Sequence, residues 1–264
     1  MRSVLTKTLY DKRTFIVGWS LGLFFLGWLL TIFFPSLRDS GSGLTKLATG
    51  LPPAFAGLLG NLADMSHIET YLGSQLFDIR MPLMIGIVSI LLGVSLSVVD
   101  EEKGGIRVMT ALPVSRGSLL LQKWGALAVI AVVVVTATIL GVVIGLLTIN
   151  QGIDPLVLVP LGLVTALLAI ALATLILCIG LASGLRSITM ASGVILAVGS
   201  FFLTTFARSI DWLKDYEKLS IFHYFPAIDV AKGTIRFENV VLYAVIIIVS
   251  LLVALFLFDR RDIK

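Results

Sequence analysis

The sequence has few of the residues that carry catalytic or metal chemistry. Among 264 residues it has one cysteine and two histidines. Cys178 is that single cysteine, which excludes an intramolecular disulfide and a cysteine metal cluster. His67 and His223 lack the spacing of a metal-binding pair. No Gly-x-x-x-x-Gly-Lys-Ser/Thr phosphate-binding loop occurs, so we do not expect this chain to hydrolyse ATP itself.

Charged residues are also scarce, which indicates that lipid rather than water surrounds much of this protein. Only 14% of the residues are charged while 58% are hydrophobic, against about 25% charged in ordinary soluble domains. Six runs of 19 to 27 residues contain no Asp, Glu, Lys, Arg or His, and each is long enough to cross a bilayer as a helix. The sequence therefore predicts an all-α polytopic membrane protein with spans at 15–34, 81–99, 124–149, 155–181, 188–206 and 239–258.

The basic residues predict the orientation. Segments 1–14, 100–123, 182–187 and 259–264 lie on one side and hold twelve of the 20 lysine and arginine residues, although they are shorter in total than the segments opposite. The positive-inside rule places this side, with both termini, in the cytoplasm. The bases are scattered over short loops, which makes nucleic-acid binding a poor interpretation of the net charge of +4.

The segments outside the spans carry local patterns. Residues 1–14 place Val4, Leu5 and Leu9 on one face of an amphipathic interfacial helix, with a frayed basic tail as the alternative. The external loop 35–80 predicts two short surface helices, the second marked by apolar residues from Ile68 to Ile79 and by a Ser66–Glu69 capping box. These helices either cap the bundle or gate an exit path. The external loop 207–238 has an aromatic cluster typical of an interfacial belt, formed by Trp212, Phe222, Tyr224 and Phe225.

The loop 100–123 is the most informative of these segments. Three acids, Asp100 to Glu102, follow an apolar span, where they oppose the helix dipole. Two glycines then form a hinge, a short apolar stretch ends at Pro113, and Ser115 can cap the next helix. This order of elements favours docking to a soluble partner over a simple connector.

The spans themselves show only weak functional patterns. No ionisable side chain lies inside them, which argues against an ion-coupled carrier and a membrane-embedded enzyme. Three glycine pairs at four-residue spacing predict close helix packing, within the subunit or at a dimer seam: Gly18 and Gly22, Gly141 and Gly145, Gly180 and Gly184. Hydroxyl side chains such as Thr138, Thr165 and Thr174 either line a polar path or bond back to their own helix.

The loop motifs resemble those of a known family. The sequences Asp100-Glu-Glu-Lys-Gly104 and Leu112-Pro-Val-Ser-Arg116, followed by Lys123 at the third span, resemble the membrane subunits of ABC exporters of the second class, the ABC-two permeases. The resemblance covers the whole chain, including Asp11-Lys-Arg13, Asp64 to Phe77, Leu219 to Tyr224 and the ending Phe258-Asp-Arg-Arg-Asp262. Gly105 departs from the family, whose members often have Thr there.

The resemblance implies a function and its partners. It implies a single permease domain over 1–264 in a bacterial inner membrane, with 1–14 as an elbow helix and 100–123 as a cytoplasmic coupling loop. Two permeases, identical or homologous, would assemble with two cytoplasmic ABC ATPase subunits that bind ATP and Mg. The chain itself would bind no cofactor and no metal and would not be an enzyme. The residues implied in coupling are Glu101, Glu102, Gly104, Leu112, Pro113, Ser115 and Arg116.

The sequence does not identify the transported substrate. The apolar spans suggest an amphiphilic or hydrophobic substrate in contact with membrane lipids, and no substrate-binding residue is identified. The alternatives are an ion-coupled carrier or channel that acts without an ATPase, and a non-transporting membrane anchor or sensor that uses the same loop.

Overall fold

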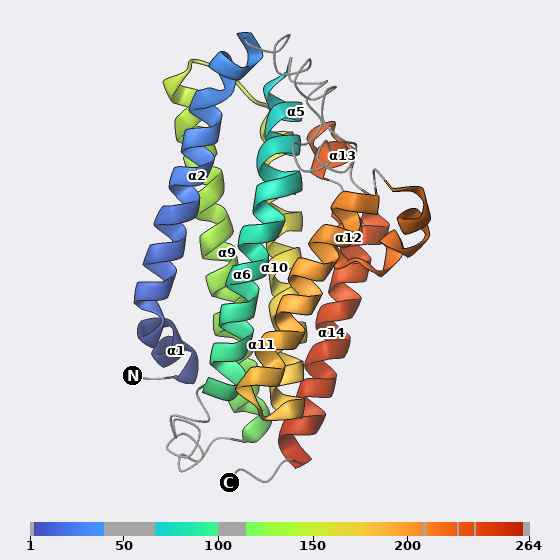
Figure 1. Cartoon of the computed structure of the whole chain (residues 1–264). Helices are drawn as coiled ribbons and strands as arrows, with labels where there is room; N and C mark the ends of the chain where they lie inside the picture. Colours follow the sequence, from blue (N-terminus) through green and yellow to red (C-terminus); the bar gives the residue numbers. More distant parts are fainter. Residues whose placement is uncertain are drawn as a thin grey trace.

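The computed structural model is a bundle of helices that run roughly parallel to one long axis (Figure 1). It describes residues 3–39, 67–99, 115–207, 210–225, 227–234 and 236–260. Six helices in these ranges are long and apolar enough to cross a membrane, and the ranges contain no strand. The prediction of an all-α polytopic membrane protein is confirmed.

The bundle has two distinct ends. Helix α1 (Val4–Asp11), the start of α9 (Arg116–Thr148) and the end of α14 (Phe237–Arg260) lie together at the end called here the terminal end. Helices α5 (Ile68–Leu72) and α13 (Ala227–Ala231) lie at the opposite, far end. The prediction that both chain ends share one side agrees with this arrangement.

The remaining helices complete six spans. The first is α2 (Arg13–Asp39), and α9, α10 (Pro155–Ser183) and α14 are the third, fourth and sixth. The second joins α5, η2 (Gly73–Arg80), α6 (Met81–Val94) and η3 (Ser95–Val99), and the fifth joins α11 (Arg186–Val194), η4 (Ile195–Gly199) and α12 (Ser200–Ala207). The elements η2, η3 and η4 are π-helical, whereas the far-end elements η5 (Asp211–Leu219) and η6 (Ile221–Tyr224) are 3₁₀-helical.

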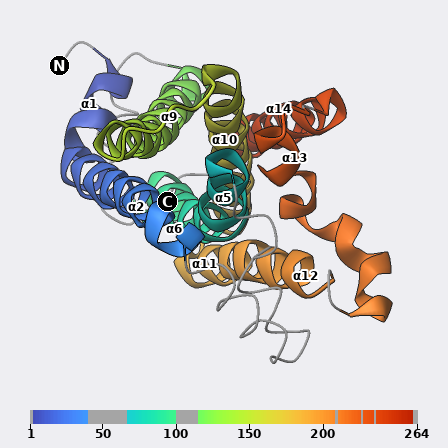
Figure 2. The same ribbon diagram turned by 90° about the horizontal axis from the view of Figure 1, so that it is seen from above.

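Helix α10 is the centre of the bundle. It packs against α6, α9, α11 and α14, while α2 lies outside and packs mainly on α9 (Figure 2). The apolar side chains of α10, such as Leu161, Leu168 and Leu172, are fully buried. Figure 2 also shows that α2 and α14 lie on opposite sides of this centre.

The second span begins much earlier than predicted. The stretch from Ile68 to Ile79 is not a separate surface helix, because it continues without a break into α6. Most of its residues are buried within the bundle, and the Tyr71 hydroxyl donates to the carbonyl of Leu30 in α2 over 2.9 Å. The other predicted surface helix and Ser66 lie outside the described residues, and the helix is capped at His67 without a side-chain bond.

The sequence predicts spans without ionisable side chains, but the longer second helix includes three charged residues. Glu69, Asp78 and Arg80 belong to the helix of 32 residues from Ile68 to Val99. Such a helix is about 48 Å long, whereas the hydrocarbon core is about 30 Å thick. The charged residues therefore occupy the far-end extension of the span. Pro82 follows the wider π-helical turn of η2, which is one way a membrane helix accommodates a missing backbone donor.

The predicted N-terminal helix is present and amphipathic. Helix α1 buries Val4 and Thr8 and packs on α9. The backbone changes direction at Lys12, and α2 begins at Arg13.

The aromatic cluster at the far end does not form a uniform interfacial belt. Phe222 and Phe225 are buried, whereas Trp212 is exposed.

The three glycine pairs have three different roles. Gly141 and Gly145 let α9 approach α2, since a Cβ on Gly141 would overlap the carbonyl of Phe24. Gly180 packs against Ser97, but Gly184 ends α10 in the left-handed conformation with φ of +63°. Gly18 and Gly22 face open space, since a Cβ added at either position would meet no atom within 4 Å.

Candidate functional site

Two of the seven predicted coupling residues lie within the described part of the chain. The side chain of Ser115 accepts a hydrogen bond from the backbone of Ser118 over 3.3 Å, so it caps α9 as predicted. Arg116 donates to the carbonyl of Asp259 near the end of α14 over 3.5 Å, a favourable place for a cation. Glu101, Glu102, Gly104, Leu112 and Pro113 lie outside the described residues.

The helix that leads into the loop is held by two lysines. Lys123 of α9 donates to the carbonyl of Leu96 in η3 over 3.3 Å, and its side chain is buried. Lys12 donates to the hydroxyl of Ser95 one residue earlier. Lys123 therefore faces the interior of the bundle. The described residues on both sides of segment 100–114 are thus attached to other helices.

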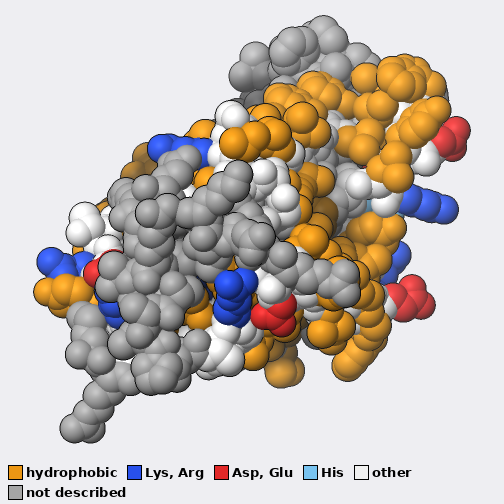
Figure 3. All heavy atoms as spheres, turned by 90° about the horizontal axis from the view of Figure 1, so that it is seen from below, with side chains coloured by type: hydrophobic (Ala, Val, Ile, Leu, Met, Phe, Trp, Pro, Cys, Tyr) orange, Lys and Arg blue, Asp and Glu red, His pale blue; other side chains and the backbone are white. Residues whose placement is uncertain are grey.

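Helix α1 is attached to the same region. The side-chain oxygen of Gln122 accepts from the backbone of Val4 over 2.9 Å and from Leu5 over 3.4 Å. Helix N-termini leave their first N–H groups without partners in the helix, so Gln122 supplies an acceptor from another helix. Figure 3 views this end and shows separate blue side chains of Lys and Arg, with no single basic patch over the described surface.

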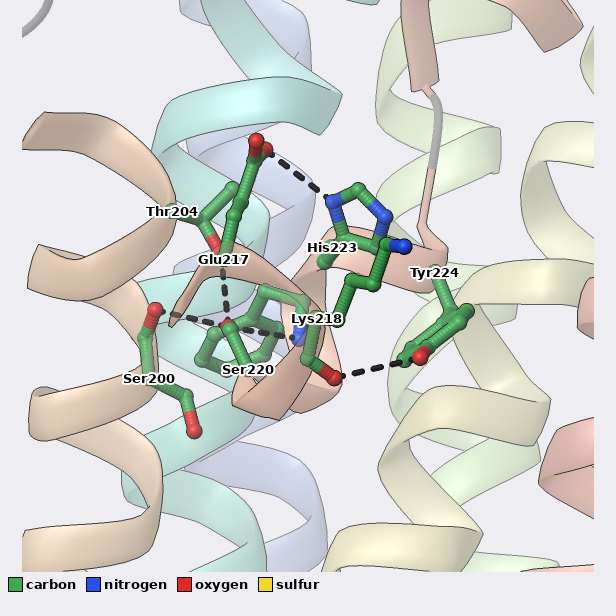
Figure 4. A network of polar contacts seen from close by, with 8 residues as sticks. Ser200, Thr204, Glu217, Lys218, Ser220, His223 and Tyr224 are labelled. Atoms are coloured by element: carbon green, nitrogen blue, oxygen red, sulfur yellow. Dashed lines mark hydrogen bonds and ion pairs between the residues drawn. The ribbon is translucent and has the colours of Figure 1, made fainter. Parts of the chain in front are cut away.

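The far end holds a second group of polar contacts, centred on Ser220 (Figure 4). The Thr204 hydroxyl donates to the Ser220 hydroxyl over 2.6 Å, and Ser220 donates to the carbonyl of Ser200 over 2.8 Å. The backbone N–H of Phe222 donates to the same Ser220 oxygen over 3.1 Å. Ser220 is 1% exposed. One hydroxyl thus joins α12 to the start of η6.

Two tyrosines complete this attachment. The Tyr243 hydroxyl of α14 donates to the carbonyl of Ile221 over 2.9 Å. The Tyr224 hydroxyl donates to the carbonyl of Lys218 over 3.1 Å (Figure 4). The segment between the fifth and sixth spans is therefore fixed to α12 on one side and to α14 on the other.

A polar cavity of about 420 Å³ lies beside this segment. His223 Nδ1 is 3.1 Å from Glu217 Oε1, and Arg236 is 3.4 Å from Asp229. No local sequence pattern brings Asp78 of η2 to the same place. The ionisable residues that line the cavity are Asp78, Glu217, His223, Asp229, Arg236 and Glu238, together with Tyr224.

An apolar groove of about 680 Å³ also lies beside this segment and shares Tyr224 and Glu238 with the polar cavity. Its walls come from α10, from η4 and α12, and from α14, while residues 218–221 and Tyr224 form its far end. This volume is within the roughly 300–1,000 Å³ of small-molecule sites. The groove was not predicted, because its walls come from residues as distant in sequence as Leu172 and Val245.

The described ranges contain no cluster of three or more His, Cys, Asp or Glu residues that could hold a metal ion. Within the spans, Thr138, Thr165 and Thr174 donate to the carbonyls of Val134, Leu161 and Ile170, each four residues earlier. The prediction that such hydroxyls bond back to their own helices is confirmed for these three.

The comparisons with known proteins add no family. Neither the protein-family models nor the curated proteins give a significant match to this sequence. The described geometry is that of a six-span membrane protein with an apolar groove beside a polar cavity at the far end.

Proposed function

We propose that this chain is the membrane-spanning permease subunit of an ATP-driven ABC exporter. The observation that supports it best is the way in which the helices on either side of segment 100–114 are held. Lys12 and Lys123 hold the helix before it, and Ser115 caps the helix after it. A displacement of that segment by a partner would therefore act directly on the second and third spans.

The energy source follows from the same proposal. The chain has no phosphate-binding loop, so ATP and Mg would bind to separate cytoplasmic ABC ATPase subunits. Their closure would move the coupling residues, and the bundle would respond as a rigid body. The terminal end would face the cytoplasm of a bacterial cell, as the positive-inside rule predicts.

A second permease copy would complete the transporter. The outward face of α2 carries Gly18 and Gly22 together with the exposed Val17, Leu21 and Phe25. Open glycines let the backbone of another helix approach closely. This face supports an association between two permeases through α2.

The decisive experiment is copurification of an ABC ATPase with the tagged chain, followed by an ATPase assay in proteoliposomes. The double variant Glu101→Ala and Glu102→Ala should lower complex yield and stimulated ATPase activity while membrane insertion is unchanged. Asp215→Ala, an acid at the far end, is the matched control and should leave both unchanged.

The alternative functions predict different results in the same assay. An ion-coupled carrier or a channel would transport without nucleotide and without a copurified ATPase. An anchor or sensor would bind the ATPase but move no cargo. Full coupled activity in the Glu101 and Glu102 double variant would contradict the docking role.

A further inference from the structure

The apolar groove at the far end has the form of a site for an elongated molecule. It extends from Leu172 and Leu175 of α10 and Val245 of α14 to Lys218 and Glu238 at its far-end rim. The first three residues are inside their spans, whereas the rim lies beside the polar segment 211–224. One end of the groove is therefore in hydrocarbon and the other is at the membrane surface.

The rim carries two unlike charges that do not neutralise each other. Among the described residues, no ion pair joins Lys218 to Glu238, and both side chains are exposed. The backbone of Lys218 is fixed by the Tyr224 hydroxyl, and the neighbouring Ser220 is fixed to α12. The ammonium and the carboxylate thus come from two different parts of the groove rim, Lys218 from a segment whose backbone is held and Glu238 from the first turn of α14.

We propose that this groove binds one phospholipid with a zwitterionic aminophosphate head group. An acyl chain lies along the apolar walls, the phosphate contacts Lys218, and the lipid's ammonium contacts Glu238. The apolar interior excludes a fully polar ligand, and the paired unlike charges match a head group that carries both signs. The proposal does not depend on an ATPase and goes beyond the proposed export function.

A second copy of the chain is a poorer occupant of this groove. The helix face with open glycines is on α2, and Figure 2 shows α2 on the opposite side of the bundle from α14. The groove is lined by large side chains, among them Leu219 and Val241, which keep a partner backbone at a distance. Lipid chains adapt to such a surface without close backbone approach.

The test counts bound lipid on the purified full-length chain. The protein is equilibrated in detergent with equal amounts of phosphatidylethanolamine and phosphatidylglycerol, and native mass spectrometry measures the lipids retained. Val245→Trp places a large side chain in the groove, while Leu252→Trp, about two turns further along the same exposed face, is the matched control. We expect one retained phosphatidylethanolamine in the wild type and in Leu252→Trp, and none in Val245→Trp.

The rim charges are tested separately. Lys218→Ala should weaken both lipids about fivefold, the upper range for one exposed ion pair. Glu238→Gln should weaken phosphatidylethanolamine by a similar factor and leave phosphatidylglycerol unchanged, because only the first carries an amine. Thermal unfolding midpoints equal to the wild type show that each variant is folded.

Two results would overturn the proposal. Equal lipid retention in Val245→Trp and Leu252→Trp would mean that the lipid is bound outside the groove. A change from oligomer to monomer in Val245→Trp, measured by mass photometry, would mean that another protein chain covers the groove.

Discussion

The side-chain oxygen of Gln122 lies 2.9 Å from the backbone nitrogen of Val4, so a residue of α9 caps the first turn of α1. The two residues are 118 positions apart in the sequence. This bond attaches the N-terminal helix to the third span at the same level where Lys123 binds η3. The terminal end is therefore one connected unit of α1, α9 and the end of the second span.

Replacing Gln122 tests this attachment. Gln122→Ala removes the acceptor and should destabilise α1 by about 1 kcal/mol, the usual effect of losing an N-cap. Hydrogen exchange at Val4 and Leu5 should accelerate while α9 stays protected. Gln122→Glu keeps an acceptor oxygen and should exchange like the wild type. Unchanged exchange in Gln122→Ala would show that α1 is held by its apolar contacts alone.

Replacing Ser220 tests the corresponding attachment at the far end. Ser220→Ala removes the buried hydroxyl that bonds Thr204, Ser200 and Phe222. Leaving buried partners unsatisfied should cost about 1–3 kcal/mol of unfolding free energy. Thr148→Ala removes an exposed hydroxyl bonded to Ile144 and is the control, expected to change stability by less than about 0.5 kcal/mol. Thermal unfolding measures both, and equal midpoints would refute the role of Ser220.

The two glycine environments make opposite predictions for one substitution. Gly141→Leu should destabilise the bundle by about 1–3 kcal/mol or more, because the added side chain meets the backbone of Phe24. Gly18→Leu has open space around it and should leave the monomer fold intact. It should weaken self-association instead, measured as a loss of dimer in mass photometry. A stable dimer of Gly18→Leu would place the second permease on another face.

The orientation can be measured with one cysteine at a time. Cys178→Ser gives a cysteine-free chain. In that background Tyr216→Cys at the far end should react with a membrane-impermeant maleimide on intact cells. Tyr10→Cys at the terminal end should react only after the membrane is permeabilised. Both tyrosines are exposed, so accessibility within the protein does not separate them. The reverse labelling pattern would invert the predicted topology.

The number of spans was predictable because a helix that crosses the hydrocarbon of a membrane is a long run without charged residues. Runs free of charge predicted all six helices, and each run lies inside one helix of the structure to within a residue, although several of the helices extend well beyond their runs. The start of the second span was not predictable in this way. Glu69, Asp78 and Arg80 look like loop residues in the sequence, yet Gly73 lies against Ala231, a contact between distant segments. Burial of that stretch depends on tertiary packing.

The candidate sites differ in the same way: contacts between residues close in sequence were predictable, whereas contacts between distant helices were not. The Ser115 cap follows from residues within three positions of one another, so the sequence predicted it. The positions of Gln122, Ser220 and the groove rim depend on helices that meet only in the folded bundle. Residues such as Lys218 and Glu238 look like ordinary surface charges until their shared groove is known.

Under the proposed function, the unbroken second span would also act as a lever. About 30 Å of continuous helix separates Val99, which precedes segment 100–114, from Asp78 at the polar cavity. Since no loop interrupts this rod, a tilt imposed near Val99 would reach the cavity wall as a displacement of Asp78. The π-helical turns of η2 and η3, where the winding is wider, mark the two places where the rod can change its pitch. Under the proposed coupling, a force applied at one membrane surface would thus be delivered at the other by a single piece of backbone.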